Sequence, residues 1–338
     1  MMKGKTLITG ATGFTGSYLA RWLVQQGESV RAIHRPNSRF ALVEEVKDKI
    51  EWVEADLLDV PALTAAMQGV DKVYHTAATV SFDKRDIPQM MAINAKGTAN
   101  VVNLCLSEGV GRMLHLSSVA AIGRNRPKAV ITEADQWERS KYNSPYAISK
   151  FRAEREVWRG MVEGMNAVIL NPSIILGGGW WNSGSARIVQ RVAKGEKFFP
   201  PGKTGFVDVR DVVQVAHLIM ESSIQQERFI VVADNRPYHE VMKKLAEELH
   251  VKPPSIPARP WMIQVLRQIE AFRSALTGSR PLITKAIARN MFTEYEFRQD
   301  KLQQHLNFTF RPLSKTLSES AKLYQHTHQQ EYGILPFP

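Results

Sequence analysis

The chain has 338 residues, 44% hydrophobic and 23% charged, which is the composition of an ordinary globular protein and not of a disordered one. No apolar run approaches the roughly 18 residues that a spanning helix needs, and the start leads into a strand and not into a signal peptide, so we expect a cytoplasmic protein without a membrane span. The net charge is +11, but Lys and Arg are scattered and no nucleic-acid-binding module occurs, so no nucleic-acid partner is expected. The single cysteine, Cys105, excludes an intrachain disulfide, and no metal site is predicted.

The first half of the chain alternates between strand and helix patterns. Strands are predicted over 5–9, 29–34, 51–54, 72–75, 113–117 and 167–170, and helices over 14–26, 39–49, 60–68, 88–107 and 145–161. Such alternation forces parallel strands with helices on both faces. The expected fold class is therefore α/β, a doubly wound parallel sheet (Rossmann fold).

The second half has a different texture, with glycine-rich and proline-rich turns. It predicts a smaller, mostly helical C-terminal substrate lobe. The segment 206–211 and the apolar stretch to Met220 look like a return to the sheet, so residues 1–172 plus about 204–232 are assigned to the dinucleotide-binding domain, and about 173–203 plus 233–338 to the substrate lobe. Trp180, Trp181 and Trp261 either offer apolar surface to a hydrophobic carbonyl substrate or pack the core of this lobe.

A glycine loop with the spacing G-x-x-G-x-x-G follows the first strand and precedes the first helix. The first glycine permits a tight turn, the second lets the backbone approach a pyrophosphate, and the third allows close packing of helix on strand. The helix N-terminus then offers unpaired N–H groups to the anion. The loop predicts a dinucleotide site with the contacts Gly10, Thr12, Gly13, Phe14, Thr15 and Gly16.

About 20 residues further on, where an NAD site carries an acid, the sequence has Arg35, with Arg39 close behind. A guanidinium there would pair with the 2′-phosphate of NADP, so NADP(H) is preferred and NAD(H) is the alternative. The other interpretation is that both arginines are solvated residues opening the second helix. Asp56, after the third strand, either caps the following helix or accepts a hydrogen bond from the adenine amino group.

Tyr146 and Lys150 are one helical turn apart, so both side chains project from the same face. The ammonium is expected to lower the phenol pKa from its ordinary value of about 10 towards neutrality. A pair at this spacing also arises by chance in a lysine-rich chain. Its weight comes from its position, because it follows the glycine loop and a strand that ends in Ser117 and Ser118 at a carboxyl edge, where parallel sheets bind ligands.

Together these features resemble the extended branch of the short-chain dehydrogenase/reductase superfamily (the NAD-dependent epimerase/dehydratase family). That branch contains dihydroflavonol reductases, cinnamoyl-CoA reductases, 3β-hydroxysteroid dehydrogenases and sugar-nucleotide epimerases. The resemblance spans nearly the whole chain and includes Asn94-Ala95-Lys96-Gly97-Thr98, Asn171-Pro172-Ser173 and Phe206-Val207-Asp208-Val209-Arg210-Asp211.

The resemblance implies that Ser118 holds the substrate carbonyl, with Ser117 as the alternative, and that Tyr146 exchanges the proton. Lys150 would also hydrogen-bond the nicotinamide ribose, and Asn94 would either support a proton-relay water or act in packing. Further residues implied to line the cofactor are Leu57, Ala77, Ala78, Pro172 and Ser173, whereas His75 and His115 are interpreted as structural.

The predicted function is NADP(H)-dependent reduction of a small-molecule ketone or aldehyde, of the dihydroflavonol-reductase-like kind. Arg35 and the segment 170–177 favour this reaction. The alternatives are an NAD(P)-dependent sugar-nucleotide epimerase or dehydratase, which shares the machinery, and a non-catalytic NADP-binding sensor or scaffold. The resemblance also implies a homodimer.

Overall fold

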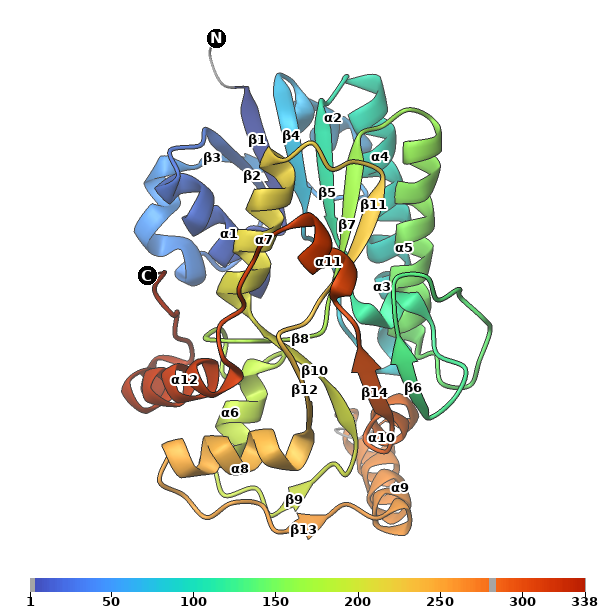
Figure 1. The fold of residues 1–338 in the computed structure, drawn as a ribbon, viewed down its shortest axis with the longest axis vertical. Coiled ribbons are helices and arrows are strands. Elements are labelled where there is room, and N and C mark those ends of the chain that lie inside the picture. The colour runs from blue at the N-terminus through green and yellow to red at the C-terminus, as the bar shows by residue number, and fades with distance from the viewer. Residues whose placement is uncertain (1–3, 280–283, 338) are drawn as a thin grey trace.

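The computed structural model describes residues 4–279 and 284–337. A seven-stranded parallel sheet lies at its centre (Figure 1). Across the sheet the strands are β11 (Glu227–Val231), β7 (Ala167–Pro172), β5 (Arg112–Leu116), β4 (Val70–His75), β1 (Lys5–Thr9), β2 (Val30–His34) and β3 (Glu51–Glu54). The chain reverses its direction of winding at β1, between β2 and β4, which is where doubly wound sheets bind ligands. The doubly wound sheet predicted from the sequence is confirmed.

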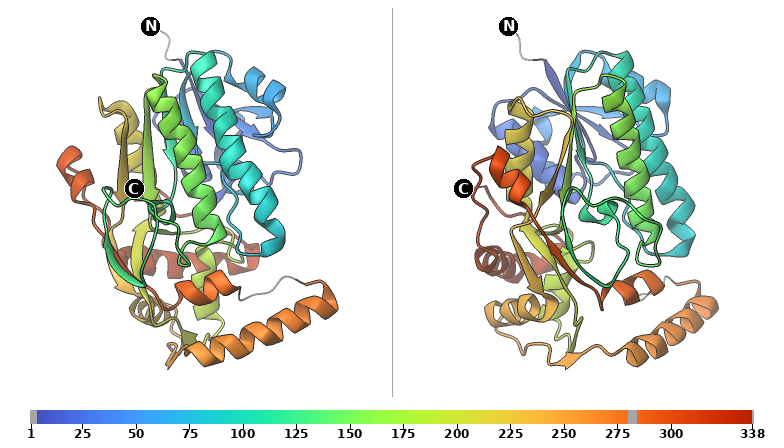
Figure 2. Two further views of the ribbon diagram at one scale, coloured as in Figure 1. Left: turned by 90° about the vertical axis from the view of Figure 1, so that its right-hand side faces the viewer. Right: turned by 45° about the vertical axis from the view of Figure 1, so that its right-hand side comes forward.

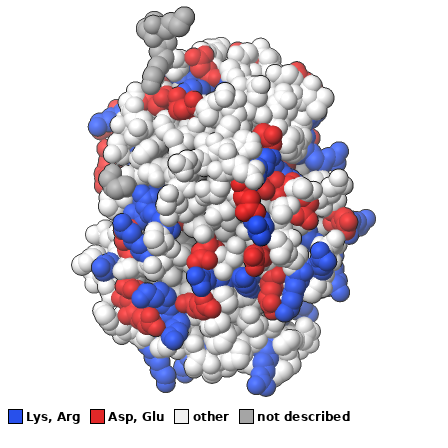
Figure 3. All heavy atoms as spheres, in the orientation of Figure 1, with Lys and Arg blue, Asp and Glu red and all other residues white. Residues whose placement is uncertain are grey.

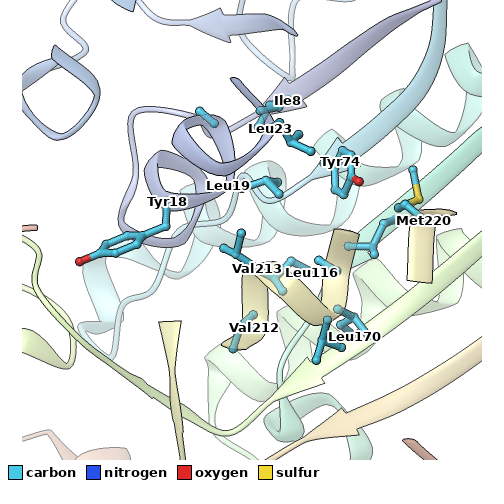
Figure 4. Packing of buried hydrophobic residues seen from close by; sticks show 14 of the residues in the cluster. Ile8, Tyr18, Leu19, Leu23, Tyr74, Leu116, Leu170, Val212, Val213 and Met220 are labelled. Atoms are coloured by element: carbon cyan, nitrogen blue, oxygen red, sulfur yellow. The ribbon is translucent and has the colours of Figure 1, made fainter. Parts of the chain in front are cut away.

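Helices cover both faces of this sheet (Figure 2). One face carries α1 (Phe14–Gln25), α7 (Val209–Glu221) and the 3-10 helix η1 (Ala41–Lys49), and the other carries α2 (Val60–Met67), α4 (Gly97–Ser107) and α5 (Pro145–Val162). Figure 4 shows the packing on the first face, where Leu19 and Leu23 of α1 and Val213 of α7 meet Leu116 and Leu170 of the sheet. On the other face the lone thiol, Cys105, is buried, and burial raises its pKa to about 12.

The single helix predicted over 88–107 is present with an internal irregularity. It consists of α3 (Ile87–Met91), a π-helical turn η3 (Ala92–Lys96) and α4. A π-helical turn accommodates one extra residue and therefore changes which side chains face the sheet, and such turns are frequent at functional sites. Here the turn contains Asn94, which is buried.

The second lobe contains a five-stranded mixed sheet that the sequence patterns did not reveal. Its strands are β12 (Asp234–Pro237), β10 (Lys203–Asp208), β14 (Glu294–Phe297), β6 (Lys128–Ile131) and β8 (Ile174–Leu176). A separate ribbon pairs β9 (Phe198–Phe199) with β13 (Ile256–Pro257). The remaining elements are η2 (Lys84–Asp86), η4 (Val119–Ile122), α6 (Ala186–Ala193), α8 (Tyr238–Glu248), α9 (Pro260–Thr277), α10 (Lys285–Asn290), α11 (Asp300–His305), α12 (Leu313–Thr327) and η5 (His328–Gln330).

The prediction that the segment beginning at Phe206 returns to the central sheet is wrong. This segment forms β10 and pairs with β8, β12 and β14. The chain returns instead through α7, which packs against α1, and through β11, whose Phe229 is in register with Leu170 of β7. The apolar pattern of a strand indicates that the strand will be buried. It does not indicate which sheet the strand will join, because any sheet with an apolar face can bury it.

Trp181 is fully buried in the core of the second lobe, as in the packing interpretation.

Lys, Arg, Asp and Glu are interspersed on the face shown in Figure 3. Within the described residues, no helix is both long and apolar enough to cross a bilayer.

Candidate active site

The glycine loop makes a tight turn against the segment that follows β4. Gly10 has a φ of +82°, which favours glycine, and a Cβ on it would lie 2.7 Å from the backbone of Ala77. A Cβ on Gly16 would lie 2.1 Å from the carbonyl oxygen of Gly10, so α1 can approach the turn only with glycine at this position. Gly13 N–H closes the turn by donating to Gly10 O at 2.9 Å.

The N-terminus of α1 is left without a side-chain cap. Gly13 is the N-cap residue, no side chain of the described residues caps the helix, and its first turn contains no acidic residue. Backbone N–H groups at such a helix end bind anions such as a pyrophosphate. The loop therefore fits the phosphates of a dinucleotide. Thr12 and Thr15 are half-buried beside the turn, and the ring of Phe14 lies 3.0 Å from where a Cβ of Gly179 would be.

The two predicted phosphate-binding arginines differ in their surroundings. Arg35 is exposed directly after β2, and its backbone N–H donates to the Ser38 hydroxyl at 3.0 Å. The guanidinium of Arg39 instead lies 3.5 Å from the ring centroid of Trp180 and 3.9 Å from a carboxylate oxygen of Glu331. Within the described residues, Arg39 therefore has a carboxylate within 4.0 Å and Arg35 has none.

Asp56 does not cap the helix that follows it, so that alternative is wrong. The cap of α2 is Asp59, whose carboxylate accepts from Ala62 N at 3.2 Å, because Asp59 directly precedes the first helical residue. Asp56 lies three residues earlier and accepts from Leu58 N at 2.9 Å. The adenine interpretation of Asp56 therefore stays a prediction.

The other predicted cofactor residues follow the carboxyl ends of three strands of the central sheet. Leu57 is buried after β3, and Ala77 and Ala78 follow β4. Pro172 ends β7, and the adjacent Ser173 carries a buried hydroxyl with no hydrogen-bond partner in the described part of the chain. Carboxyl ends of parallel strands share one edge, so these residues lie along the edge that carries the glycine loop.

Tyr146 is the second residue of α5, whose N-cap is Ser144. Its phenol lies close enough to Ser118 for that side chain to oppose the rise that burial causes in the pKa of Tyr146. Ser118 follows β5 and caps η4, its hydroxyl oxygen accepting from Ala120 N at 3.2 Å. Ser117 instead opposes the rise that burial causes in the pKa of Glu154, and its buried hydroxyl has no hydrogen-bond partner among the described residues. The structure therefore brings Ser118, and not Ser117, to Tyr146, as alternation along a strand end requires.

The electrostatics of Tyr146 differ from the expectation. Burial raises the pKa of Tyr146, while the hydrogen bond from Ser118 and the charge of Arg124 oppose this rise. The Lys150 ammonium is not among these influences. It is buried and donates to Leu116 O at 2.9 Å, because a buried ammonium needs an acceptor, and its Nζ lies 3.5 Å from His115 Nε2. Burial lowers the pKa of Lys150 to about 8, against the opposing effect of Glu154.

Arg124 is a candidate functional residue that the sequence patterns did not identify. It follows Gly123, whose φ is +86°, and its guanidinium lies 4.6 Å from the ring centroid of Tyr295. Its charge also acts on Tyr146 and Tyr238. No carboxylate of the described residues lies within 4.0 Å of it. No local motif marks this arginine, because the turn after η4 and the partner strand β14 together place it.

A buried hydrogen-bond network holds the backbone carbonyl of Ser118. The side-chain amide of Asn171 donates to Ser118 O at 2.9 Å and also to the carboxylate of Glu154. Arg228 Nη1 lies 3.4 Å from Glu154, so the buried carboxylate has a cationic partner. Burial nevertheless raises the pKa of Glu154. Asn171 from the predicted motif thus fixes the backbone at Ser118.

Asn94 and the two predicted structural histidines belong to a second network. The amide group of Asn94 binds the backbone N–H and carbonyl of Thr79 at 2.7 and 2.9 Å and donates to Ser149 at 2.9 Å, so both amide hydrogens are engaged. His75 hydrogen-bonds Thr9 at 2.7 Å, and burial lowers its pKa to about 3, so the ring is neutral. Burial also lowers the pKa of His115.

Comparisons with known proteins agree with this geometry. The model of the NAD-dependent epimerase/dehydratase family matches residues 6–233. The chain is 33% identical over 265 residues to sterol demethylase protein B of Methylococcus capsulatus, which covers 77% of this chain and 79% of that protein. It is 26% identical to cinnamoyl-CoA reductase 1 of Petunia hybrida, over 98% of this chain and 93% of that one.

Solved structures have the same fold over nearly the whole chain. The structure of gox2253 is 26% identical and has a TM-score of 0.81, covering 95% of this chain and 98% of that one. The dTDP-glucose 4,6-dehydratase DesIV of Streptomyces venezuelae is 18% identical with a TM-score of 0.77, covering 96% and 98%, so it supports the fold alone.

Proposed function

The chain belongs to the NAD-dependent epimerase/dehydratase family, and on that premise we propose that it is an NADP(H)-dependent reductase of a ketone or aldehyde. It is an NAD(P)-dependent enzyme that acts on CH–OH or C=O groups. The observation that carries the proposal is the placement of Tyr146, at the start of α5, beside Ser118, which follows β5 at the edge of the sheet that carries the glycine loop. Similar proteins named cinnamoyl-CoA reductase and putative dihydroflavonol 4-reductase favour reduction over epimerisation.

In the proposed mechanism the substrate carbonyl oxygen accepts hydrogen bonds from Ser118 and Tyr146. A bound dinucleotide would supply the hydride, while Tyr146 donates its phenolic proton to the developing alkoxide. Burial keeps this phenol protonated at neutral pH because it raises the pKa of Tyr146. The phenolate formed is stabilised by Ser118 and by the positive charge of Arg124. Lys150 provides a second buried cation beneath this site and, by family resemblance, a contact to the nicotinamide ribose.

We retain Asn94 as a positioning residue within this proposal. Both of its amide hydrogens are used to hold Thr79 and Ser149, so it acts by fixing the segment after β4. The proposed cofactor contacts are those of the glycine loop, Asp56, and the residues that follow β3, β4 and β7.

Replacing Arg124 by Met is expected to raise the pKa of Tyr146, because a charge that favours the phenolate is removed. In carbonyl reduction the protonated phenol is the active form, so the alkaline limb of the pH profile of kcat/KM should move to higher pH. In alcohol oxidation the phenolate is active, and the rising limb should move in the same direction. Arg126→Met, an exposed neighbour, serves as the control, and a profile identical to wild type in Arg124→Met would contradict the assigned electrostatic role.

The preference for NADP(H) rests on Arg35. Replacing Arg35 by Asp is expected to weaken NADPH binding by about 10-fold or more and to leave NADH binding nearly unchanged, because a carboxylate would repel the 2′-phosphate. The measurement is the Kd of each cofactor by calorimetry. Arg39→Gln is the matched variant, since Arg39 lies against Trp180. Equal losses for both cofactors in Arg35→Asp would refute the contact.

The proposed reaction is tested by offering the purified chain NADPH and a panel of carbonyl compounds. Stoichiometric oxidation of NADPH with formation of an alcohol is the expected result. Interconversion of a sugar nucleotide without net cofactor consumption would identify an epimerase. Cofactor binding without turnover of any compound, including sugar nucleotides, would identify a sensor or scaffold.

A further inference from the structure

Helix α9 carries a stripe of large apolar side chains that the protein leaves uncovered. The side chains are exposed by between 47% and 70%, and they are Trp261, Val265, Ile269, Phe272 and Leu276. At about 100° per residue, these positions fall within an arc of roughly 80° on one side of the helix. An exposed apolar stripe of this length marks an interaction surface.

The opposite side of α9 faces the protein. Ile263 and Glu270 are the buried residues of the helix, and the carboxylate of Glu270 is 2.8 Å from the guanidinium of Arg273. Figure 2 shows α9 along the outer edge of the second lobe, with no other element on its outward side. The helix is therefore held by one side and presents its apolar stripe away from the molecule.

The neighbouring ribbon of β9 and β13 extends this apolar surface. Phe198 of β9 is paired with Ile256 of β13, and the two side chains are 42% and 40% exposed. The strand β13 ends three residues before α9 begins, so ribbon and helix occupy the same end of the molecule (Figure 1).

Basic residues accompany the stripe. Residues 252–279 contain four basic residues and one acidic residue, and the acidic one is the buried Glu270. Lys252 and Arg259 are exposed, and Lys194 and Lys197 are exposed next to β9. Figure 3 shows Lys and Arg side chains projecting from this end of the molecule. Residues 194–199 and 252–279, which contain the ribbon strands and α9, hold six basic and two acidic residues, so the segments that form this surface carry a net positive charge.

We propose that α9 and the β9–β13 ribbon dock the enzyme onto an anionic phospholipid surface. An amphipathic helix with Trp, Phe and Leu on one face and Lys or Arg beside it inserts its apolar side chains at the boundary of head groups and acyl chains, while the basic residues bind the anionic head groups. Charge complementarity favours this partner over a second copy of the chain, because a symmetric contact through this end would bring the same positive residues together. The proposal is independent of the reaction proposed above.

The test is co-sedimentation of the full chain with vesicles of phosphatidylcholine, with and without one third phosphatidylglycerol. The chain should bind the anionic vesicles, and binding should weaken with added salt, because screening reduces the attraction to the head groups. The triple variant Trp261→Ser/Ile269→Ser/Phe272→Ser should bind these vesicles at least about 10-fold more weakly than the wild type. Since these side chains are exposed, the variant should keep the Tm and the cofactor affinity of the wild type.

A matched control replaces three apolar residues that are exposed elsewhere, in Val130→Ser/Val162→Ser/Leu218→Ser. This control should bind vesicles like the wild type, and Lys252→Gln/Arg259→Gln should lose only the preference for anionic lipid. The proposal is overturned if the wild type does not bind anionic vesicles, or if both triple variants bind equally. It is also overturned if light scattering shows a dimer that the stripe variant dissociates while vesicles bind neither form.

Discussion

Tyr146→Phe is expected to lower kcat for carbonyl reduction by between about 10²- and 10⁴-fold, the range that a positioned acid contributes. The phenylalanine ring occupies the same space but has no proton to donate. The hydroxyl of Ser118 would remain in place, since it is held through its own backbone by Asn171. The measurement is single-turnover reduction of a substrate found in the carbonyl panel, together with the Kd of NADPH, which should be unchanged.

Tyr142→Phe is the control for this variant, because Tyr142 precedes α5 and is not among the groups that act on Tyr146. It should keep wild-type turnover. A Tyr146→Phe enzyme that turns over at the wild-type rate would exclude Tyr146 as the proton donor and leave the cofactor site untouched.

Gly16→Ala is expected to weaken binding of NADP(H) by about 100-fold or more, equivalent to roughly 2.7 kcal/mol. The new Cβ would lie 2.1 Å from Gly10 O, a backbone atom that cannot rotate away. The N-terminus of α1 would have to move away from the turn, and the N–H groups proposed to bind the pyrophosphate would move with it.

Gly111→Ala tests whether this loss is specific to the loop. Gly111 precedes β5, at the edge of the sheet opposite the glycine loop, and a Cβ there would lie at a tight but tolerable 3.3 Å from Asp71 O. Its cofactor affinity should equal that of the wild type. Wild-type affinity in Gly16→Ala as well, measured by fluorescence titration with NADPH, would mean that the phosphates bind elsewhere.

The sequence predicted the parts of the site that depend on local spacing. The glycine loop, the order of six strands and the Tyr146–Lys150 spacing are encoded within short segments, and each segment folds as its pattern indicates. Alternation of side chains at a strand end predicted that only one of Ser117 and Ser118 reaches the site, and the family resemblance selected Ser118.

The features that were missed depend on which distant segments come together. β10 pairs with β8 and β14 and not with the central sheet. These partner strands come from distant parts of the chain, so the local pattern of β10 does not indicate them. The charge of Arg124 acts on Tyr146, and its guanidinium lies against Tyr295 of β14, which is 171 residues away along the chain. Lys150 was expected to act on Tyr146, but its hydrogen bond to Leu116 O depends on burial that spacing cannot reveal.

The contact between Phe14 and Gly179 has a thermodynamic consequence. Phe14 belongs to the first turn of α1, the helix proposed to face the dinucleotide phosphates, while Gly179 lies between β8 and α6 in the second lobe. A ligand that shifts either segment changes the space available to the other. If a ligand in one lobe changes the affinity of the other lobe in this way, linkage requires the effect to have the same factor in both directions.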